Sequence, residues 1–198
     1  MKVTTDQITE TVAATAEPLT VAEAKSHLRV DVTDDDTLIS AYISAATEYC
    51  EDFTGRSFVT RTYRADLPYF ADCIVLPGRP IQAITSVYYY DTASPAALTL
   101  LAASNYTLVN NIFRRAYGAT WPSVAYRDDA IQISYTAGYA PTSSPEVAAE
   151  SVPEALKCAI RLITADLYEN REAQFVGFSV IQENRAAKML LQPYRVYL

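Results

Sequence analysis

The stretch DDDTLISAYISAATEYCEDFTGRSF, residues 34–58, contains the change of period that decides the fold. Apolar side chains recur at steps of three and four residues over Leu38–Phe53, which is the repeat of an amphipathic helix. Asp34–Asp36 stand where the unpaired N–H groups of a helix start favour negative charge, and Gly55 is a residue typical of a helix end. From Ser57 the period falls to two, the repeat of a strand. The stretch therefore predicts a long helix followed by a β region.

The β region extends well beyond this point. Further short segments rich in β-branched and aromatic residues follow, separated by turn formers such as Pro77-Gly78 and Ser94-Pro95. These segments are Ile74–Leu76, Ile84–Tyr90, Tyr106–Val109 and Ala130–Thr136. No helical period interrupts residues 57–140, so we expect an antiparallel sheet or a small sandwich.

Helical signals return on both sides of the β region. Thr20 and Glu23 have the spacing of a capping box and predict a short helix that ends near Arg29. After a linker that is rich in proline and serine, the apolar stripe Leu156–Leu167 predicts another helix, and a shorter one is expected at about Val180–Leu191. The last residues are too apolar for a free tail, so we expect them to lie on a surface.

The sequence therefore predicts an α+β fold, in which a helical core from the N- and C-terminal helices carries a β-rich antiparallel insertion. The expected parts are a flexible N-terminal arm (1–17), the first part of the helical core (18–56), the β-rich insertion (57–140), and the second part of the core with the C-terminal segment (141–198).

Composition limits the possible chemistry. His27 is the single histidine, and no nucleophile-turn motif such as GxSxG occurs, so a hydrolase of the Ser/His/Asp kind is disfavoured. Glycine is scarce, with 5 residues, which disfavours a glycine-rich phosphate loop. The three cysteines have no CxxC spacing, and we expect reduced thiols in a protein made in the cytoplasm. We expect no enzyme, no cofactor, no metal, no secretory signal and no membrane span.

The net charge of −7 is concentrated in the N-terminal third. Residues 1–56 contain four basic and eleven acidic side chains, whereas residues 57–140 contain six and five. An acidic surface repels DNA phosphates, so sequence-independent binding of nucleic acid by this region is disfavoured. A solvated helical face is the more common reason for such a charge, and the alternative is a channel wall that must not bind DNA.

Tyrosine is plentiful, and tyrosine and arginine are residues that often carry interface energy. For contacts between subunits we expect five residues of the insertion, namely Tyr88, Tyr90, Arg114, Arg115 and Trp121. An alternative function is a β-sandwich module of a virion that binds a ligand or carbohydrate through Tyr88–Tyr90 and Trp121.

Seven segments, taken in order, resemble the phage head-tail connector (adaptor) family, whose members occur in tailed phages and in phage-derived gene transfer agents. The segments are Leu19–Asp31, Tyr49–Phe58, Leu76–Ile81, Ser86–Asp91, Tyr135–Tyr139, Leu167–Ala173 and Pro193–Arg195. The resemblance covers about residues 18–198. No single segment is diagnostic, and their order carries the resemblance.

The resemblance implies a structural role in the virion neck, at the head-tail junction. Family members form a closed ring of about twelve copies beneath the portal protein, and they continue the DNA channel toward a stopper or tail-completion protein. DNA would pass through the ring without specific binding.

Two sets of residues are expected to serve this role. The C-terminal segment would bind the portal through Phe175, Phe178, Met189, Leu190, Tyr194, Arg195, Tyr197 and Leu198. The channel would be lined by the carboxylates of Asp34, Asp35, Asp36, Glu48, Glu51 and Asp52.

Overall fold

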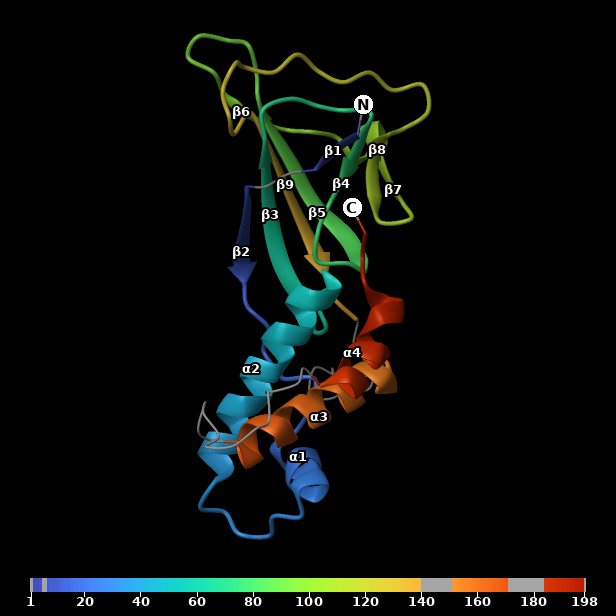
Figure 1. Ribbon diagram of the computed structural model, residues 1–198. Coiled ribbons are helices and arrows are strands. Elements are labelled where there is room, and N and C mark those ends of the chain that lie inside the picture. The colour runs from blue at the N-terminus through green and yellow to red at the C-terminus, as the bar shows by residue number, and fades with distance from the viewer. Residues whose placement is uncertain (1, 5–6, 140–150, 171–183, 198) are drawn as a thin grey trace. The chain divides into compact units, whose positions relative to one another are not determined.

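The computed structural model describes residues 2–4, 7–139, 151–170 and 184–197, and it divides the chain into two compact units (Figure 1). The β unit consists of Met1–Ala14 and Thr60–Gly138, and the helical unit consists of Thr15–Val59 and Tyr139–Leu198. Within the described ranges the chain forms four α-helices and nine strands, which confirms the predicted α+β class. The division between the units falls after Val59 and after Gly138.

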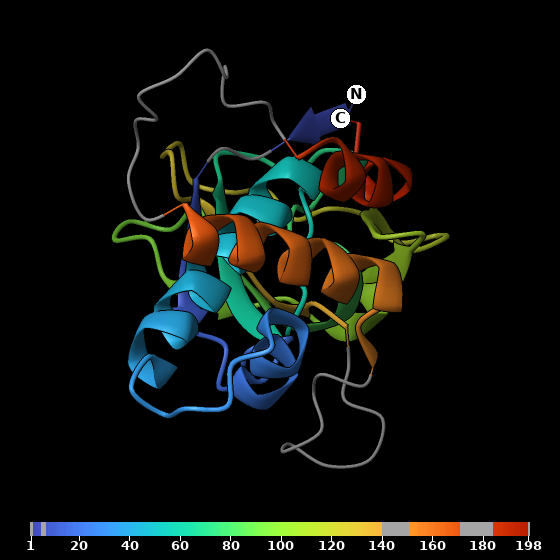
Figure 2. The same ribbon diagram turned by 60° about the horizontal axis from the view of Figure 1, so that its bottom comes forward.

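The helical unit contains α1 (Val21–Leu28), α2 (Asp36–Thr54), α3 (Glu154–Glu169), α4 (Arg185–Leu191) and the 3₁₀ helix η3 (Gln192–Tyr194). Figure 2 shows α3 crossing the middle of this unit, with the other helices around it. Its core is formed by apolar side chains from both ends of the chain, for example Ile39 and Ile43 of α2 with Leu156 and Ile160 of α3. Burial of these stripes, which neither chain end can achieve alone, holds the unit together.

Two local signals define the helix ends as the sequence predicts. The Thr20 side chain accepts a hydrogen bond from the Glu23 N–H and the Glu23 carboxylate accepts one from the Thr20 N–H, so the capping box starts α1. Gly55 adopts a left-handed conformation with φ 66° and ends α2. At the start of α2, by contrast, Asp35 is the N-cap residue but its side chain makes no capping hydrogen bond.

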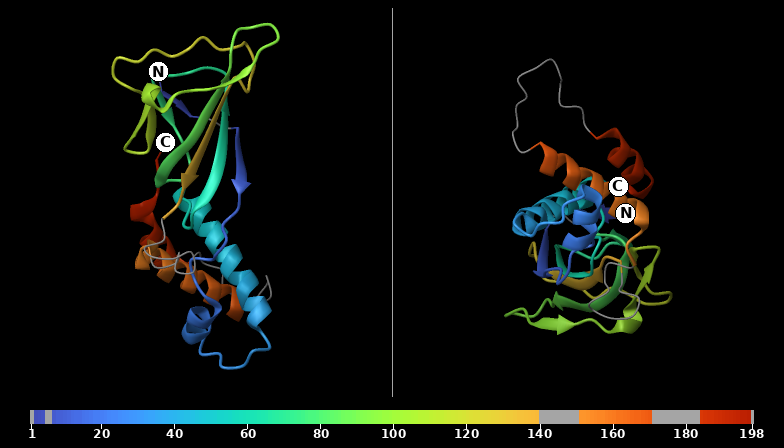
Figure 3. Two further views of the ribbon diagram at one scale, coloured as in Figure 1. Left: turned by 180° about the vertical axis from the view of Figure 1, so that it is seen from behind. Right: turned by 90° about the horizontal axis from the view of Figure 1, so that it is seen from below.

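The β unit contains two sheets. The five-stranded sheet has the order β2-β3-β9-β5-β6, with β2 at Ile8–Val12, β3 at Arg61–Leu67, β5 at Ile81–Tyr90, β6 at Leu98–Leu100 and β9 at Ile131–Ala137. The four-stranded sheet has the order β1-β4-β8-β7, with β1 at Lys2–Thr4, β4 at Cys73–Val75, β7 at Tyr106–Val109 and β8 at Ile112–Arg115. Neighbouring strands are antiparallel except for β1 and β4. The long strands β2, β3, β9 and β5 lie side by side in Figure 3.

The expectation of a flexible arm over residues 1–17 is wrong for its described strands. Ile8–Val12 forms an antiparallel edge strand on β3, in which Ile8 lies opposite Ala65 and Glu10 opposite Tyr63. An ion pair of 3.3 Å between Glu10 and Arg61 adds to this pairing. The segment is polar because an edge strand packs only one face, so its sequence lacks a strong apolar repeat.

Candidate functional site

The C-terminal residues lie on the end of α2, as the apolar character of the tail predicts. The Val196 N–H donates a hydrogen bond of 2.8 Å to the Thr54 carbonyl, and the Arg56 Nε donates one of 2.5 Å to the Tyr194 carbonyl. A Cβ on Gly55 would lie 3.6 Å from the Val196 Cβ, so the tail passes close to this turn. The chain end is thereby held to the last turn of α2.

This docking builds a surface around the ring of Phe53, which we call the C-terminal cluster and define as Tyr49, Phe53, Lys188, Arg195 and Tyr197. The Arg195 guanidinium lies 5.0 Å from the Phe53 ring centre and 5.6 Å from that of Tyr197, and the Lys188 ammonium lies 6.0 Å from Phe53. Cations at such distances are attracted to the electron-rich ring faces. Two positive groups are therefore held in fixed positions at one surface.

The cluster is open to solvent. Tyr49 is 48% exposed and Tyr197 is 70% exposed, and the neighbouring Met189 is 75% exposed. Tyr49 stacks on Phe53, and the Tyr197 hydroxyl accepts a hydrogen bond of 2.6 Å from the Gln192 amide. Among the described residues Arg195 forms no ion pair with a carboxylate. The surface combines exposed aromatic area with positive charge, a composition typical of protein interfaces.

The structure separates the residues expected to bind the portal. Leu190 and Tyr194 pack against the helical core, Arg195 and Tyr197 belong to the C-terminal cluster, and Met189 stands exposed. The expected residues Phe175, Phe178 and Leu198 lie outside the described residues. Tyr49, Phe53 and Lys188 were missed by the sequence reasoning, because the apolar residues among them read simply as part of a helix stripe.

The six carboxylates expected in the channel fall into two groups. Three have partners within the helical unit: Asp36 pairs with Lys25 at 2.6 Å, Asp35 accepts from the Tyr168 hydroxyl at 2.6 Å, and Glu51 accepts from the Phe58 N–H at 2.6 Å. These contacts stabilise the ends of α2. The others, Asp34, Glu48 and Asp52, are exposed.

In the β unit, Tyr88 and Tyr90 lie on the opposite sheet face from Tyr89, which packs against the core. Leu100 lies opposite Tyr88 and Leu98 opposite Tyr90, so the two leucines share their face and are exposed. The Arg127 guanidinium lies 3.8 Å above the Tyr90 ring. This outer face carries apolar and aromatic side chains at the edge of the sheet.

Trp121 is a partly buried core residue. Its ring stacks on Phe70, with centroids 4.4 Å apart and planes at 7°, and on Phe113 at 5.8 Å and 12°. Because Trp121 and Tyr89 point into the core, Trp121 and Tyr88–Tyr90 do not form one exposed stacking platform. Arg114 is exposed, and Arg115 lies 3.7 Å from Asp72.

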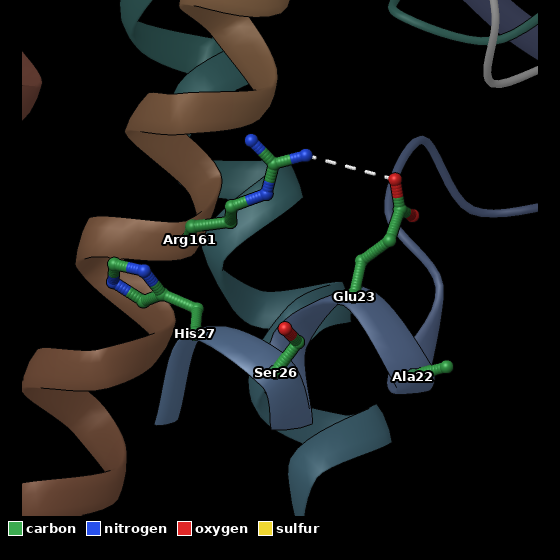
Figure 4. A pocket seen from close by; sticks show the side chains of 5 residues that line it. All are labelled: Ala22, Glu23, Ser26, His27 and Arg161. Atoms are coloured by element: carbon green, nitrogen blue, oxygen red, sulfur yellow. Dashed lines mark ion pairs between the residues drawn. The ribbon is translucent and has the colours of Figure 1, made fainter. Parts of the chain in front are cut away.

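A shallow pocket of about 620 Å³ lies between α1 and α3, lined by Ala22, Glu23, Ser26, His27 and Arg161 (Figure 4). Arg161 lies 3.6 Å from Glu23 and 2.5 Å from Glu154, so its charge is balanced within the unit. Within the described ranges His27 makes no hydrogen bond to a serine or a carboxylate. The pocket therefore lacks the nucleophile–base–acid arrangement of a hydrolase.

Other reactive groups give no second site. Burial raises the pKa of the Cys50 thiol to about 12, which keeps it protonated and unreactive at neutral pH. In the part of the chain that the structure describes, histidine, cysteine and carboxylate side chains nowhere gather in threes around a space for a metal ion. The described helices also include none with the length and apolar character needed to cross a bilayer.

Comparison with solved structures finds the same fold in the necks of gene transfer agent (GTA) particles. The chain matches a chain of the neck of an empty GTA particle, computed with C6 symmetry, at a TM-score of 0.77 and 24% identity, covering 97% of this chain and 96% of that one. A chain in the virion of a native GTA particle matches with the same coverage at 0.77 and 23%, and one in a native neck computed with C12 symmetry at 0.72 and 22%.

Sequence comparison finds a similar family. No curated protein matches the chain. The family model of the phage gp6-like head-tail connector proteins matches residues 18–111, which include α1, α2 and much of the β unit. Over residues 18–111 the chain is therefore similar to the phage gp6-like head-tail connector proteins.

Proposed function

We propose that this protein is a head-tail connector that acts as a closed ring of about twelve identical copies in the virion neck, where it joins the portal of the head to the tail. The observation that carries the proposal is the family match, supported by a fold shared along nearly the full chain with neck proteins of GTA particles. The role is structural and needs no catalysis or cofactor. The protein would be made in the bacterial cytoplasm and then assembled into the particle.

The charge distribution suits a passage for DNA. The helical unit contains nine basic and sixteen acidic residues, whereas the β unit contains seven of each, so the whole net charge of −7 belongs to the helical unit. Glu48 and Asp52 lie one turn apart on the exposed side of α2. We assign them to the bore, where they would keep phosphates from binding, because each phosphate-neutralising contact adds affinity for DNA.

Portal binding is assigned to the C-terminal segment, on the exposed side of α4 around Met189. Leu191 and Ala187 of the same helix are buried in the helical core, so deleting the whole segment would also remove core residues. The test therefore uses Met189→Glu, which leaves the buried face of α4 unchanged. We expect this variant to fold and to lose affinity for the portal, and unchanged affinity would contradict the assignment.

Contacts between copies are assigned in part to the β unit. The outer face with Tyr88, Tyr90, Leu98 and Leu100 exposes apolar area at a sheet edge, which a soluble monomer usually protects. Arg114 adds an exposed positive charge on the other sheet. The far end of the ring would meet a stopper or tail-completion protein.

The ring is tested directly on the purified protein. Sedimentation velocity and negative-stain electron microscopy, with and without the portal protein, should show closed rings of one size. A protein that remains monomeric in both conditions would contradict the proposal.

A further inference from the structure

We propose that the loop between α1 and α2 of one copy docks on the C-terminal cluster of the next copy, through its exposed residues Asp31, Val32 and Asp34. We call these three residues the acidic apex. The inference rests on the proposed ring and names one pair of surfaces that joins its copies. Both surfaces belong to the helical unit.

The C-terminal cluster has the properties of a receptor for carboxylates. The ring of Phe53 holds Arg195 and Lys188 at 5.0 and 6.0 Å, and Tyr197 supports the Arg195 guanidinium from a second side. Held in this way, the two cations lose little conformational freedom when a carboxylate binds. Tyr197 supplies exposed apolar area beside them.

The acidic apex is a well-anchored projection. The Val30 N–H donates to the Lys25 carbonyl at 3.1 Å and the Asp36 N–H to the Thr33 carbonyl at 3.1 Å. The Lys25–Asp36 ion pair holds the base of the loop.

Between these anchors the apex itself is presented to solvent. Val32 is 60% exposed, and Asp31 and Asp34 beside it are exposed. An apolar side chain flanked by two carboxylates complements an aromatic surface that carries two cations.

The two surfaces cannot meet within one molecule. The apex precedes the first residue of α2, and Tyr49 and Phe53 of the cluster lie in its last two turns. Figure 1 shows the loop from α1 entering one end of α2. A helix of 19 residues is about 28 Å long, so the surfaces lie at opposite ends of a rigid rod. Complementary surfaces at two ends of one body make a head-to-tail contact, and head-to-tail contacts close into rings when the rotation between copies allows it.

Charge reversal tests the pairing, under the condition in which the unchanged protein forms rings. One variant, K188E/R195E, makes the cluster acidic, and the other, D31K/D34K, makes the apex basic. Each alone should require about tenfold or more protein to form rings, because like charges then face each other. An equimolar mixture should restore the rings, since each surface of one variant now fits the opposite surface of the other, and native mass spectrometry should find the two variants alternating.

Control variants test whether a charge reversal elsewhere has the same effect and whether each variant folds. Arg185→Glu changes an exposed arginine one turn from Lys188, and Asp128→Lys changes an exposed aspartate of the β unit, and both should form rings like the unchanged protein. K188R/R195K should also behave like the unchanged protein, and circular dichroism should show that every variant is folded. Rings that survive both reversals, or a mixture that stays dissociated, would overturn the inference while the ring itself stands. Absence of rings from the unchanged protein would instead overturn the proposed function.

Discussion

At the residue scale, the capping box of α1 links stability to pH. Burial opposes ionisation of Glu23, but hydrogen bonds from the Thr20 N–H and hydroxyl outweigh it and lower the pKa of this carboxyl from its ordinary value of 4.5. Because the pKa of Glu23 is lower in the folded protein than in the unfolded chain, the ionised carboxylate stabilises the fold at pH values above the unfolded-state pKa. This stabilisation is lost as the pH falls through the folded-state pKa. Thr20→Ala should lower the free energy of unfolding by about 1 kcal/mol at pH 7.

Glu23→Gln should flatten the fall in stability below pH 4.5, as urea unfolding at several pH values would show, and an unchanged slope would contradict this account.

A second residue-scale prediction concerns Trp121. Its ring stacks between Phe70 and Phe113 in the β unit. Trp121→Ala should therefore reduce the free energy of unfolding by about 2–3 kcal/mol. This is small for the truncation of a large core side chain, because Trp121 is only partly buried. Tyr117→Ala, at a fully exposed position, is the control and should change little. If Trp121→Ala left stability unchanged and instead prevented association, the expected role of Trp121 in a subunit contact would hold.

At the element scale, the end of α2 depends on a left-handed residue. Gly55→Ala should cost about 1 kcal/mol, because a Cβ is unfavourable at φ 66° while its contact with Val196 at 3.6 Å is an ordinary one. Gly118→Ala is the control for the backbone strain alone, because Gly118 has φ 76° and a Cβ placed there would meet no atom within 4 Å. Calorimetry should find similar losses for the two variants. A much larger loss at Gly55 would mean that the tail packs on this turn more tightly than the structure shows.

The edge strand β2 gives the other element-scale prediction. Removing residues 1–12 should destabilise the β unit, because it exposes the edge of β3 and removes the ion pair of Arg61 with Glu10. Hydrogen exchange should then show faster exchange along Arg61–Leu67. Unchanged exchange would support the flexible arm that the sequence alone suggested.

These elements show what the sequence could predict. Capping boxes, a left-handed glycine and a repeat of three to four residues act locally, so α1, α2 and the helix ends followed from the sequence. The strands β1, β2, β6 and β8 did not, because each is only three to five residues long, too short for a clear alternating pattern. The C-terminal cluster was missed for a similar reason, since Phe53 and Arg195 meet only after the tail folds back on α2.

At the scale of the whole molecule, the assignment of Glu48 and Asp52 to the bore predicts how the ring treats DNA. The unchanged protein should not retain duplex DNA at physiological salt, because the helical unit carries the entire net negative charge. Glu48→Lys with Asp52→Lys should introduce binding that weakens steeply as salt rises. Mobility-shift titrations would measure this, with Asp72→Lys and Asp128→Lys together on the β unit as the charge-matched control. Equal retention by the control would show that the position of the charges is irrelevant.

The most direct test of the central claim is a cryo-electron microscopy reconstruction of the neck of the particle in which we propose that this protein acts. The account predicts a closed ring of this chain directly between portal and tail, with DNA able to pass along its axis. Density for the chain elsewhere in the particle, or a neck in which head and tail join without it, would contradict the account.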